Sequence, residues 1–272
     1  MSAPDLQRTF TGDIPRNYDQ FLGPAWFRGH SAELARLMPA DPGGDVLEIA
    51  CGTGLSTEYL RKRLDPRRRL VATDLSGAML DYARTKLARL EGITWQIADA
   101  GKLPFADGEF AAIACSFGVM FVPDRKAVFS EARRVLRPGG LFVFNVWDRM
   151  EENPGALAYE EVMERMFPGD KEVLFRVPYL LADEGLLREV LEGAGFTAQR
   201  IEKVCVPIQG VTARDVATGQ VRGTPRGLML AKRGVEFDDA IGKVAEALEK
   251  RGGKGASFRL DSNAILVEAV AR

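Results

Sequence analysis

The residues most able to do chemistry surround one glycine-containing loop. Glu48 lies near the end of the apolar run Val46–Ala50, and Cys51-Gly52-Thr53-Gly54 then leads into a segment with helical periodicity. Glycines at such a turn let the backbone approach a ligand closely, where a side chain would clash. The loop therefore predicts a nucleotide-type ligand, either a dinucleotide or S-adenosylmethionine.

Two features of this loop separate these ligands. A dinucleotide site typically has the pattern G-x-G-x-x-G, whose third glycine packs the helix tightly against the strand. Thr57 stands at that third position. Glu48 would repel a pyrophosphate, whereas its carboxylate suits a cationic amino-acid group or an ordered water. The loop thus favours S-adenosylmethionine, and an NAD(P)-dependent oxidoreductase is the alternative.

Two further acids end the neighbouring apolar runs. Asp74 closes the run Val71–Asp74, where a carboxylate can accept hydrogen bonds from both ribose hydroxyls. Asp99 follows the next run, where it could accept from an adenine amino group. Leu75 and Met79 could pack on the two faces of the adenine. Each feature alone is unspecific, but their order along the chain favours a nucleoside site.

The elements that must position these residues follow an alternating pattern. Short apolar runs predict strands at 46–50, 70–73, 94–98, 111–115 and 141–146, and helical periodicity predicts helices over 55–64, 79–90 and 128–136. Ser76 is expected to cap the second helix. Such repetition predicts a doubly wound α/β fold, whose parallel sheet is covered on both faces and binds ligands beyond the carboxyl ends of its strands.

After Trp147 this alternation breaks. Asp183 is expected to cap a helix that ends near Gly193, and strands are expected near 198–206 and 265–271. The stretches 149–181 and 210–257 look irregular, apart from a helix near 238–250. We expect a single domain, with an N-terminal helical lid at 1–40, a cofactor-binding core at 41–148, and these two stretches as insertions that cap the substrate.

Composition limits the class of protein. The 272 residues carry a formal net charge of −1 and no long basic block, so no nucleic-acid partner is expected. Cys51, Cys115 and Cys205 lie far apart, which indicates neither a disulfide framework nor a metal site. We find no signal peptide or membrane-spanning run. We therefore expect a cytoplasmic protein, a monomer or homodimer, with a small-molecule substrate.

Four segments resemble the class I methyltransferases that use S-adenosylmethionine, in particular the small-molecule type that includes the ubiquinone and menaquinone biosynthesis enzymes (methyltransferase type 11-like). These segments are LEIACGTG (47–54), VATDLS (71–76), ADAGKLPFADGEF (98–110) and RVLRPGG (134–140). The resemblance implies a seven-stranded sheet with an antiparallel final strand. It also implies that a methyl group is transferred to an O, N or C atom of a small acceptor. A non-catalytic module that binds S-adenosylmethionine remains a further alternative.

The resemblance also implies roles for individual residues. It places Glu48 near the methionyl amine, Asp74 on the ribose and Asp99 on the adenine amino group. This chain departs from the family in one loop position, where Ala50 stands in place of the first loop glycine. Tyr18 lies in a leading segment that folds over the cofactor and could bond its carboxylate. The expected cofactor-binding residues are Tyr18, Glu48, Ala50, Cys51, Gly52, Gly54, Asp74, Leu75, Met79, Asp99, Ala100 and Ser116.

No catalytic residue is identified with the same clarity. Methyl transfer needs a base only if the acceptor must lose a proton. His30 is the one histidine and could reach the site from the lid, but a solvent-facing position at a helix start is the favoured interpretation. Phe117 and Met120 could belong to the core or to the pocket wall. Polar candidates in the insertions, each expected to be solvated, are Tyr159, Glu160, Arg176, Tyr179 and Arg222.

Overall fold

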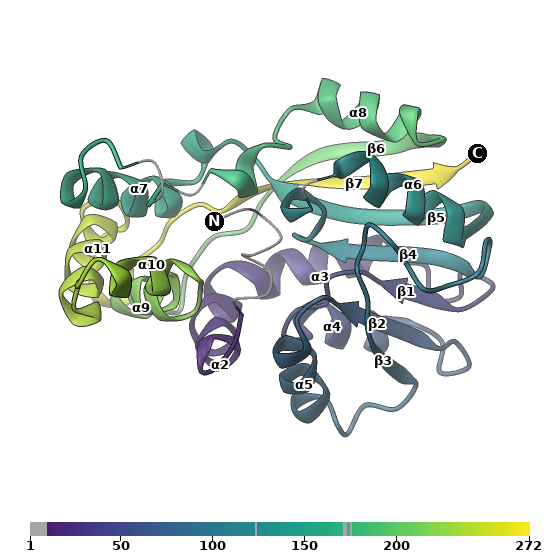
Figure 1. Ribbon diagram of the computed structural model, residues 1–272, viewed down its shortest axis with the longest axis horizontal. Coiled ribbons are helices and arrows are strands. Elements are labelled where there is room, and N and C mark those ends of the chain that lie inside the picture. Colours follow the sequence, from purple (N-terminus) through teal and green to yellow (C-terminus); the bar gives the residue numbers. More distant parts are fainter. Residues whose placement is uncertain (1–9, 123, 171–172, 175) are drawn as a thin grey trace.

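The computed structural model describes residues 10–122, 124–170, 173–174 and 176–272, and it contains one seven-stranded sheet (Figure 1). The strand order is β3-β2-β1-β4-β5-β7-β6. Strands β1 to β5 run parallel, and β7 pairs antiparallel with both β5 and β6. The strands are β1 (Val46–Glu48), β2 (Leu70–Asp74), β3 (Ile93–Ile97), β4 (Phe110–Ser116), β5 (Leu136–Trp147), β6 (Phe196–Cys205) and β7 (Asn263–Ala271). The doubly wound fold and the antiparallel final strand are both confirmed.

Helices cover both faces of the sheet, because the central strands are apolar on both sides. On one face lie α3 (Arg28–Leu37), α4 (Leu55–Arg63) and α5 (Gly77–Lys86). On the other lie α6 (Arg125–Val135) and α8 (Glu184–Gly193). The Ser76 side chain accepts from the Met79 amide, and the Asp183 side chain accepts from the Leu186 amide, so both expected helix caps are confirmed.

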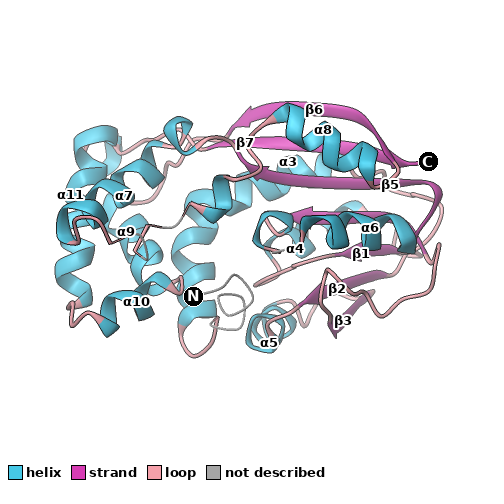
Figure 2. Cartoon of the chain, turned by 45° about the horizontal axis from the view of Figure 1, so that its top comes forward, coloured by secondary structure: helices cyan, strands magenta, loops and turns pink. Residues whose placement is uncertain are grey.

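The late part of the chain adds a helical body beside the sheet (Figure 2). It contains α7 (Pro154–Met166), α9 (Ala213–Arg222), α10 (Arg226–Lys232) and α11 (Phe237–Gly252), which share a second hydrophobic core, and we call these four helices the cap. The sequence interpretation expected only the last of them. It was wrong because these helices bury their apolar residues against one another. Pro154, which interrupts the sequence pattern, stands at the first turn of α7, where proline is tolerated.

The N-terminal segment links the cap to the sheet. It runs through α2 (Ile14–Asn17) and the π-helix η1 (Tyr18–Phe27) into α3. Helix α9 packs closely on η1, since a Cβ added to Gly223 would lie 2.9 Å from the Tyr18 amide nitrogen. Short 3-10 turns complete the described structure at η2 (Val119–Phe121), η3 (Met150–Glu152), η4 (Val177–Tyr179) and η5 (Gly255–Ser257).

None of the helices in the described ranges combines the length and the apolar character that a membrane crossing requires.

Candidate active site

A first pocket opens at the carboxyl ends of β1, β2 and β4, and we call it the loop pocket. Its wall contains most of the predicted cofactor-binding residues: Tyr18, Ala50, Gly52, Asp74, Leu75, Met79, Asp99, Ala100 and Ser116. These residues come from five separate segments of the chain. The structure therefore brings them together at the edge where a doubly wound sheet binds its ligands.

Asp74 is held in place by the backbone around it. Its Oδ2 accepts from the Gly52 amide at 2.8 Å, and its Oδ1 accepts from the Ser76 amide at 2.8 Å. Burial raises the pKa of this carboxyl, while the amide bonds act in the opposite direction. Each carboxylate oxygen has two lone pairs, so both can accept a further hydrogen bond from a ligand in the pocket.

The loop itself has an unusual backbone. Gly52 has φ +54°, and a Cβ added there would meet no atom within 4 Å, so the space above this glycine is open to a ligand. Ala50 has φ +55°, a region that costs an L-residue about 1–2 kcal/mol. The glycine that the resemblance expects at position 50 would avoid this strain. The chain therefore keeps the loop conformation at the expense of stability.

Three predicted residues do not line the loop pocket. Glu48 is fully buried beneath the loop, where its Oε1 accepts from the Ser56 hydroxyl, and burial raises its pKa to about 7. Cys51 is also buried, and Gly54 faces Leu87 and Ala83. The contact of Glu48 with a methionyl amine remains a prediction, and in the structure its carboxylate is bonded to the first turn of α4.

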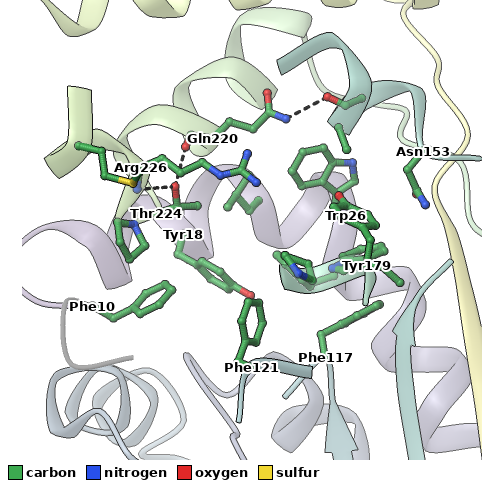
Figure 3. A pocket seen from close by; sticks show the side chains of 18 of the residues that line it. Phe10, Tyr18, Trp26, Phe117, Phe121, Asn153, Tyr179, Gln220, Thr224 and Arg226 are labelled. Atoms are coloured by element: carbon green, nitrogen blue, oxygen red, sulfur yellow. Dashed lines mark hydrogen bonds between the residues drawn. The ribbon is translucent and has the colours of Figure 1, made fainter. Parts of the chain in front are cut away.

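A second pocket lies between the sheet and the cap, and we call it the cap pocket (Figure 3). It shares Phe10, Tyr18, Phe117 and Phe121 with the loop pocket, and we call these four residues the junction. The rest of its wall comes from η1, β5, α7, η4, α9, α10 and the loops beside them. The two pockets therefore meet at a wall made of four aromatic side chains.

The sequence interpretation missed most of this second wall. Trp26 and Phe27 come from η1, Trp147 ends β5, and Arg226 begins α10. Phe117 stacks on Trp147 with ring centroids 3.9 Å apart, although its backbone has φ +54°. Such strain in a bulky residue persists only where the surroundings enforce it. The only signal in the sequence was the aromatic content of these short segments, which equally fits a core.

His30 is placed differently from the favoured interpretation. It is 1% exposed, and its Nε2 lies 3.1 Å from the Ser262 hydroxyl, behind Phe117 and Trp147. Burial lowers its pKa to about 4. The solvent-facing interpretation was wrong because α3 turns this position toward the sheet. The ring does not reach either pocket wall, so the structure gives no support for His30 as a base.

The polar candidates of the insertions separate into three groups. Tyr179 lines the cap pocket. Tyr159 and Glu160 are buried in α7, and the Tyr159 ring lies 4.4 Å from the Arg226 guanidinium carbon. Arg176 is exposed, and Arg222 bonds Asp238 at 3.2 Å outside the pocket. The expectation that all of them are solvated was wrong for the members buried in helix α7.

Within the described residues, no group of three or more His, Cys, Asp or Glu side chains could hold a metal ion. At the junction the one ionisable side chain is Tyr18, and burial raises its pKa far above the usual range. The junction therefore offers a neutral hydroxyl and aromatic faces.

Comparisons with known proteins agree with this arrangement. Residues 46–140 match the family model described as a methyltransferase domain. The ubiquinone/menaquinone biosynthesis C-methyltransferase of Desulfotalea psychrophila is 44% identical over 142 residues, which are 51% of this chain and 56% of that protein. The demethylmenaquinone methyltransferase of Staphylococcus aureus is 33% identical over 134 residues, or 48% of this chain and 56% of that protein.

The chain thus spans about half the length of these curated relatives. Among solved structures, the phosphoethanolamine N-methyltransferase 2 of Haemonchus contortus superposes with a TM-score of 0.62 at 19% identity, covering 100% of this chain and 60% of that one. Residues 46–140 therefore resemble a methyltransferase domain, and the chain as a whole shares the fold of that solved methyltransferase.

Proposed function

We propose that the protein transfers a methyl group from S-adenosylmethionine to a small-molecule acceptor. The observation that carries this proposal is the meeting of two chemically different pockets at one point. The loop pocket presents a fixed carboxylate, Asp74, and an open glycine turn. The cap pocket is mainly apolar and aromatic, with polar side chains on the cap side. A transferase needs such an arrangement, because the donor and acceptor must be held end to end.

The residues present fit the cofactor. The open space above Gly52 leaves room for backbone contact, and Asp74 can accept from ribose hydroxyls. Leu75 and Met79 provide apolar surface for a purine, and Asp99 lies on the same wall. A dinucleotide fits less well, because Thr57 stands where its fingerprint has the third glycine and the buried acid Glu48 lies below the loop.

When bound, the cofactor supplies a methyl group on a positively charged sulfur. The chain's own residues then have the tasks of alignment and of excluding water. The four junction residues limit the access of water to the point where the two pockets meet. The Tyr18 hydroxyl points toward Phe121 and can donate to a ligand at this point (Figure 3). No described junction residue is suited to take a proton near neutral pH.

The size of the acceptor follows from the cap. Helix α9, helix α10 and the turn between them contribute Gln220, Arg226 and Thr224 to the wall opposite the junction, so the cap pocket is enclosed by protein on both sides (Figure 3). A duplex or a folded protein would not enter it. The formal net charge of −1 also gives no support for a nucleic-acid partner. Three unpaired cysteines fit a reducing, cytoplasmic location.

Two measurements test this function. S-adenosylhomocysteine should raise the melting temperature and bind in a calorimetric titration, whereas NADH and NADPH should not. Incubation of the protein with cofactor labelled in the methyl group and a metabolite extract should give a labelled small product. Stabilisation by a dinucleotide instead would support the oxidoreductase. Binding without labelled product in any extract would support a non-catalytic module.

A further inference from the structure

The loop between β3 and β4, residues 98–109, forms one wall of the loop pocket. Ala98, Asp99 and Ala100 line that pocket directly after β3. Residues 98–109 are all described, and none of them belongs to a helix or to a strand of the sheet. Irregular loops are more mobile than the elements that they connect. This wall must therefore be fixed by contacts from elsewhere.

Arg134, near the end of α6, supplies these contacts. Its guanidinium group donates to two backbone carbonyls of the loop, those of Leu103 at 2.9 Å and Phe105 at 2.7 Å. It also donates to the Asp107 carboxylate at 2.8 Å. Its remaining bonds reach both carboxylate oxygens of Glu131, at 2.7 and 2.8 Å. Because a guanidinium has five N–H donors, this set of bonds uses its whole donor capacity.

Glu131 holds the same loop at a second atom. Its Oε2 accepts from the Leu103 amide at 2.7 Å, while the Leu103 carbonyl is bonded to Arg134. The hydrogen bond from Arg134 lowers the pKa of Glu131, so this carboxylate is ionised at neutral pH. The Leu103 side chain is also buried in the main core. One ion pair on α6 thus fixes both backbone groups of Leu103.

Leu103 comes directly after the turn that presents Asp99. In this turn the Lys102 amide donates to the Asp99 carbonyl at 2.9 Å, and the Gly101 amide donates to the Asp99 Oδ1 at 2.8 Å. Asp99 is exposed, so the turn holds its carboxylate and side-chain packing does not. A shift of Leu103 would therefore move Asp99 on the pocket wall. Arg134 does not line the pocket and acts on it through Leu103.

We propose that Arg134, paired with Glu131, is a positioning residue for the adenine end of the cofactor. It holds the loop so that the Asp99 carboxylate accepts from the adenine amino group, and it thereby sets the preference of the site for adenine over other purines. This inference rests on the proposed use of S-adenosylmethionine. It also links two of the segments singled out in the sequence, 98–110 and 134–140.

Calorimetric titration of the full chain with S-adenosylhomocysteine and S-inosylhomocysteine tests this role. The two ligands differ only in the purine, where the second has an oxygen in place of the amino group. We expect the wild type to bind the adenine ligand at least about tenfold more tightly, and Arg134→Gln to prefer it less than about threefold. A purely structural role would weaken both ligands equally. An unchanged ratio in Arg134→Gln, or no preference in the wild type, would overturn the proposal.

Failure of the proposed function looks different, because S-adenosylhomocysteine itself would then not bind to the wild type. Arg133→Gln is the matched control, since this neighbouring arginine of α6 bonds the Leu136 carbonyl and not the loop. It should keep the wild-type ratio. Arg134→Lys keeps the charge but has three donors instead of five, so it should lose the preference as Arg134→Gln does. Full preference in Arg134→Lys would overturn the requirement for a guanidinium.

Glu131→Gln keeps the test informative if Arg134→Gln does not fold. It removes the charge that pairs with Arg134 and weakens the bond to the Leu103 amide, so the preference should fall at least about threefold. Asp99→Ala should abolish the preference, and adding Glu131→Gln to it should change the ratio no further. This non-additivity is expected because Glu131 acts through Asp99. A further loss in the double variant would overturn the proposal.

Discussion

The loop pocket and the cap pocket are built in different ways. In the loop pocket, the polar groups sit directly after strands, and the backbone fixes them, as the two amides on Asp74 show. In the cap pocket, the wall consists of side chains from segments far apart in the sequence, and packing fixes them. A site of the first kind can be specified by a short motif, whereas one of the second kind requires the whole fold.

This comparison is most sharply tested by Gly52→Val. A branched side chain at Gly52 would occupy the open space of the loop pocket and should lower S-adenosylhomocysteine affinity more than 100-fold, about 2.8 kcal/mol. Gly139→Val is the matched control, because Gly139 also has positive φ and open surroundings but lies outside both pockets. Calorimetry should show loss of binding only in the first variant. Retained binding would mean that the ligand lies elsewhere.

The burial of Glu48 makes the free energy of unfolding depend on pH. The pKa of Glu48 is about 7 in the folded protein, above the usual value of 4.5, so the folded state binds this proton more tightly. Its stabilising contribution is complete below pH 4.5 and is lost as the pH rises through 7. Glu48→Gln removes this dependence, which amounts to roughly 3 kcal/mol.

Denaturant unfolding of the wild type and Glu48→Gln at pH 4.5, 6 and 8 measures this loss of stability. Ser56→Ala removes the hydroxyl that lowers the pKa of Glu48, so the loss should begin at the same pH but become larger and continue to a higher pH. Parallel stability profiles for the wild type and Glu48→Gln would contradict a raised pKa of the buried Glu48 carboxyl.

Asp74→Ala removes the carboxylate from the loop pocket and leaves the Gly52 and Ser76 amides without their acceptor. We expect cofactor binding to weaken by about 1–3 kcal/mol, the cost of unpaired polar groups. Asp81→Ala, at an exposed acid on α5, should leave affinity unchanged. If calorimetry gives the same dissociation constant for Asp74→Ala as for the wild type, Asp74 is not a ligand-binding residue.

The cap side is tested by Gly223→Ala. The added methyl group would lie 2.9 Å from the Tyr18 amide, so it must push α9 away from η1. Such overpacking typically costs about 1–3 kcal/mol of unfolding free energy. Gly242→Ala, in α11 with open surroundings, should instead be neutral or stabilising. Equal unfolding midpoints for the two variants would show that α9 and η1 are not tightly packed.

The smallest expected effect belongs to Ala50→Gly. Glycine relieves the positive φ at this position but increases the entropy of the unfolded chain, so the net stabilisation should be at most about 1 kcal/mol. Ala100→Gly, on the same pocket wall without positive φ, should be neutral or destabilising. Thermal unfolding distinguishes them. A clear loss of stability in Ala50→Gly would contradict the strained loop.

The strands of the sheet and most residues of the loop pocket could be predicted from the sequence. Strand runs, caps such as Ser76, and acids such as Asp74 are local features, because backbone geometry alone carries their effect over a few residues. The order of the strands, in which β4 lies beside β1 and β7 lies between β5 and β6, is instead a tertiary feature. The predicted cofactor residues mostly lie on one wall, with Glu48, Cys51 and Gly54 behind it.

The cap pocket and the buried position of His30, by contrast, depend on tertiary packing. Trp26 and Trp147 lie more than a hundred residues apart in the sequence, and Arg226 lies further along the chain. The periodicity of apolar residues does not distinguish a pocket wall from a core. Helices α7, α9 and α10 acquire their buried faces from one another, and α3 turns His30 under Phe117 and Trp147. These features depend on side chains packing across the whole chain, which a local pattern does not record.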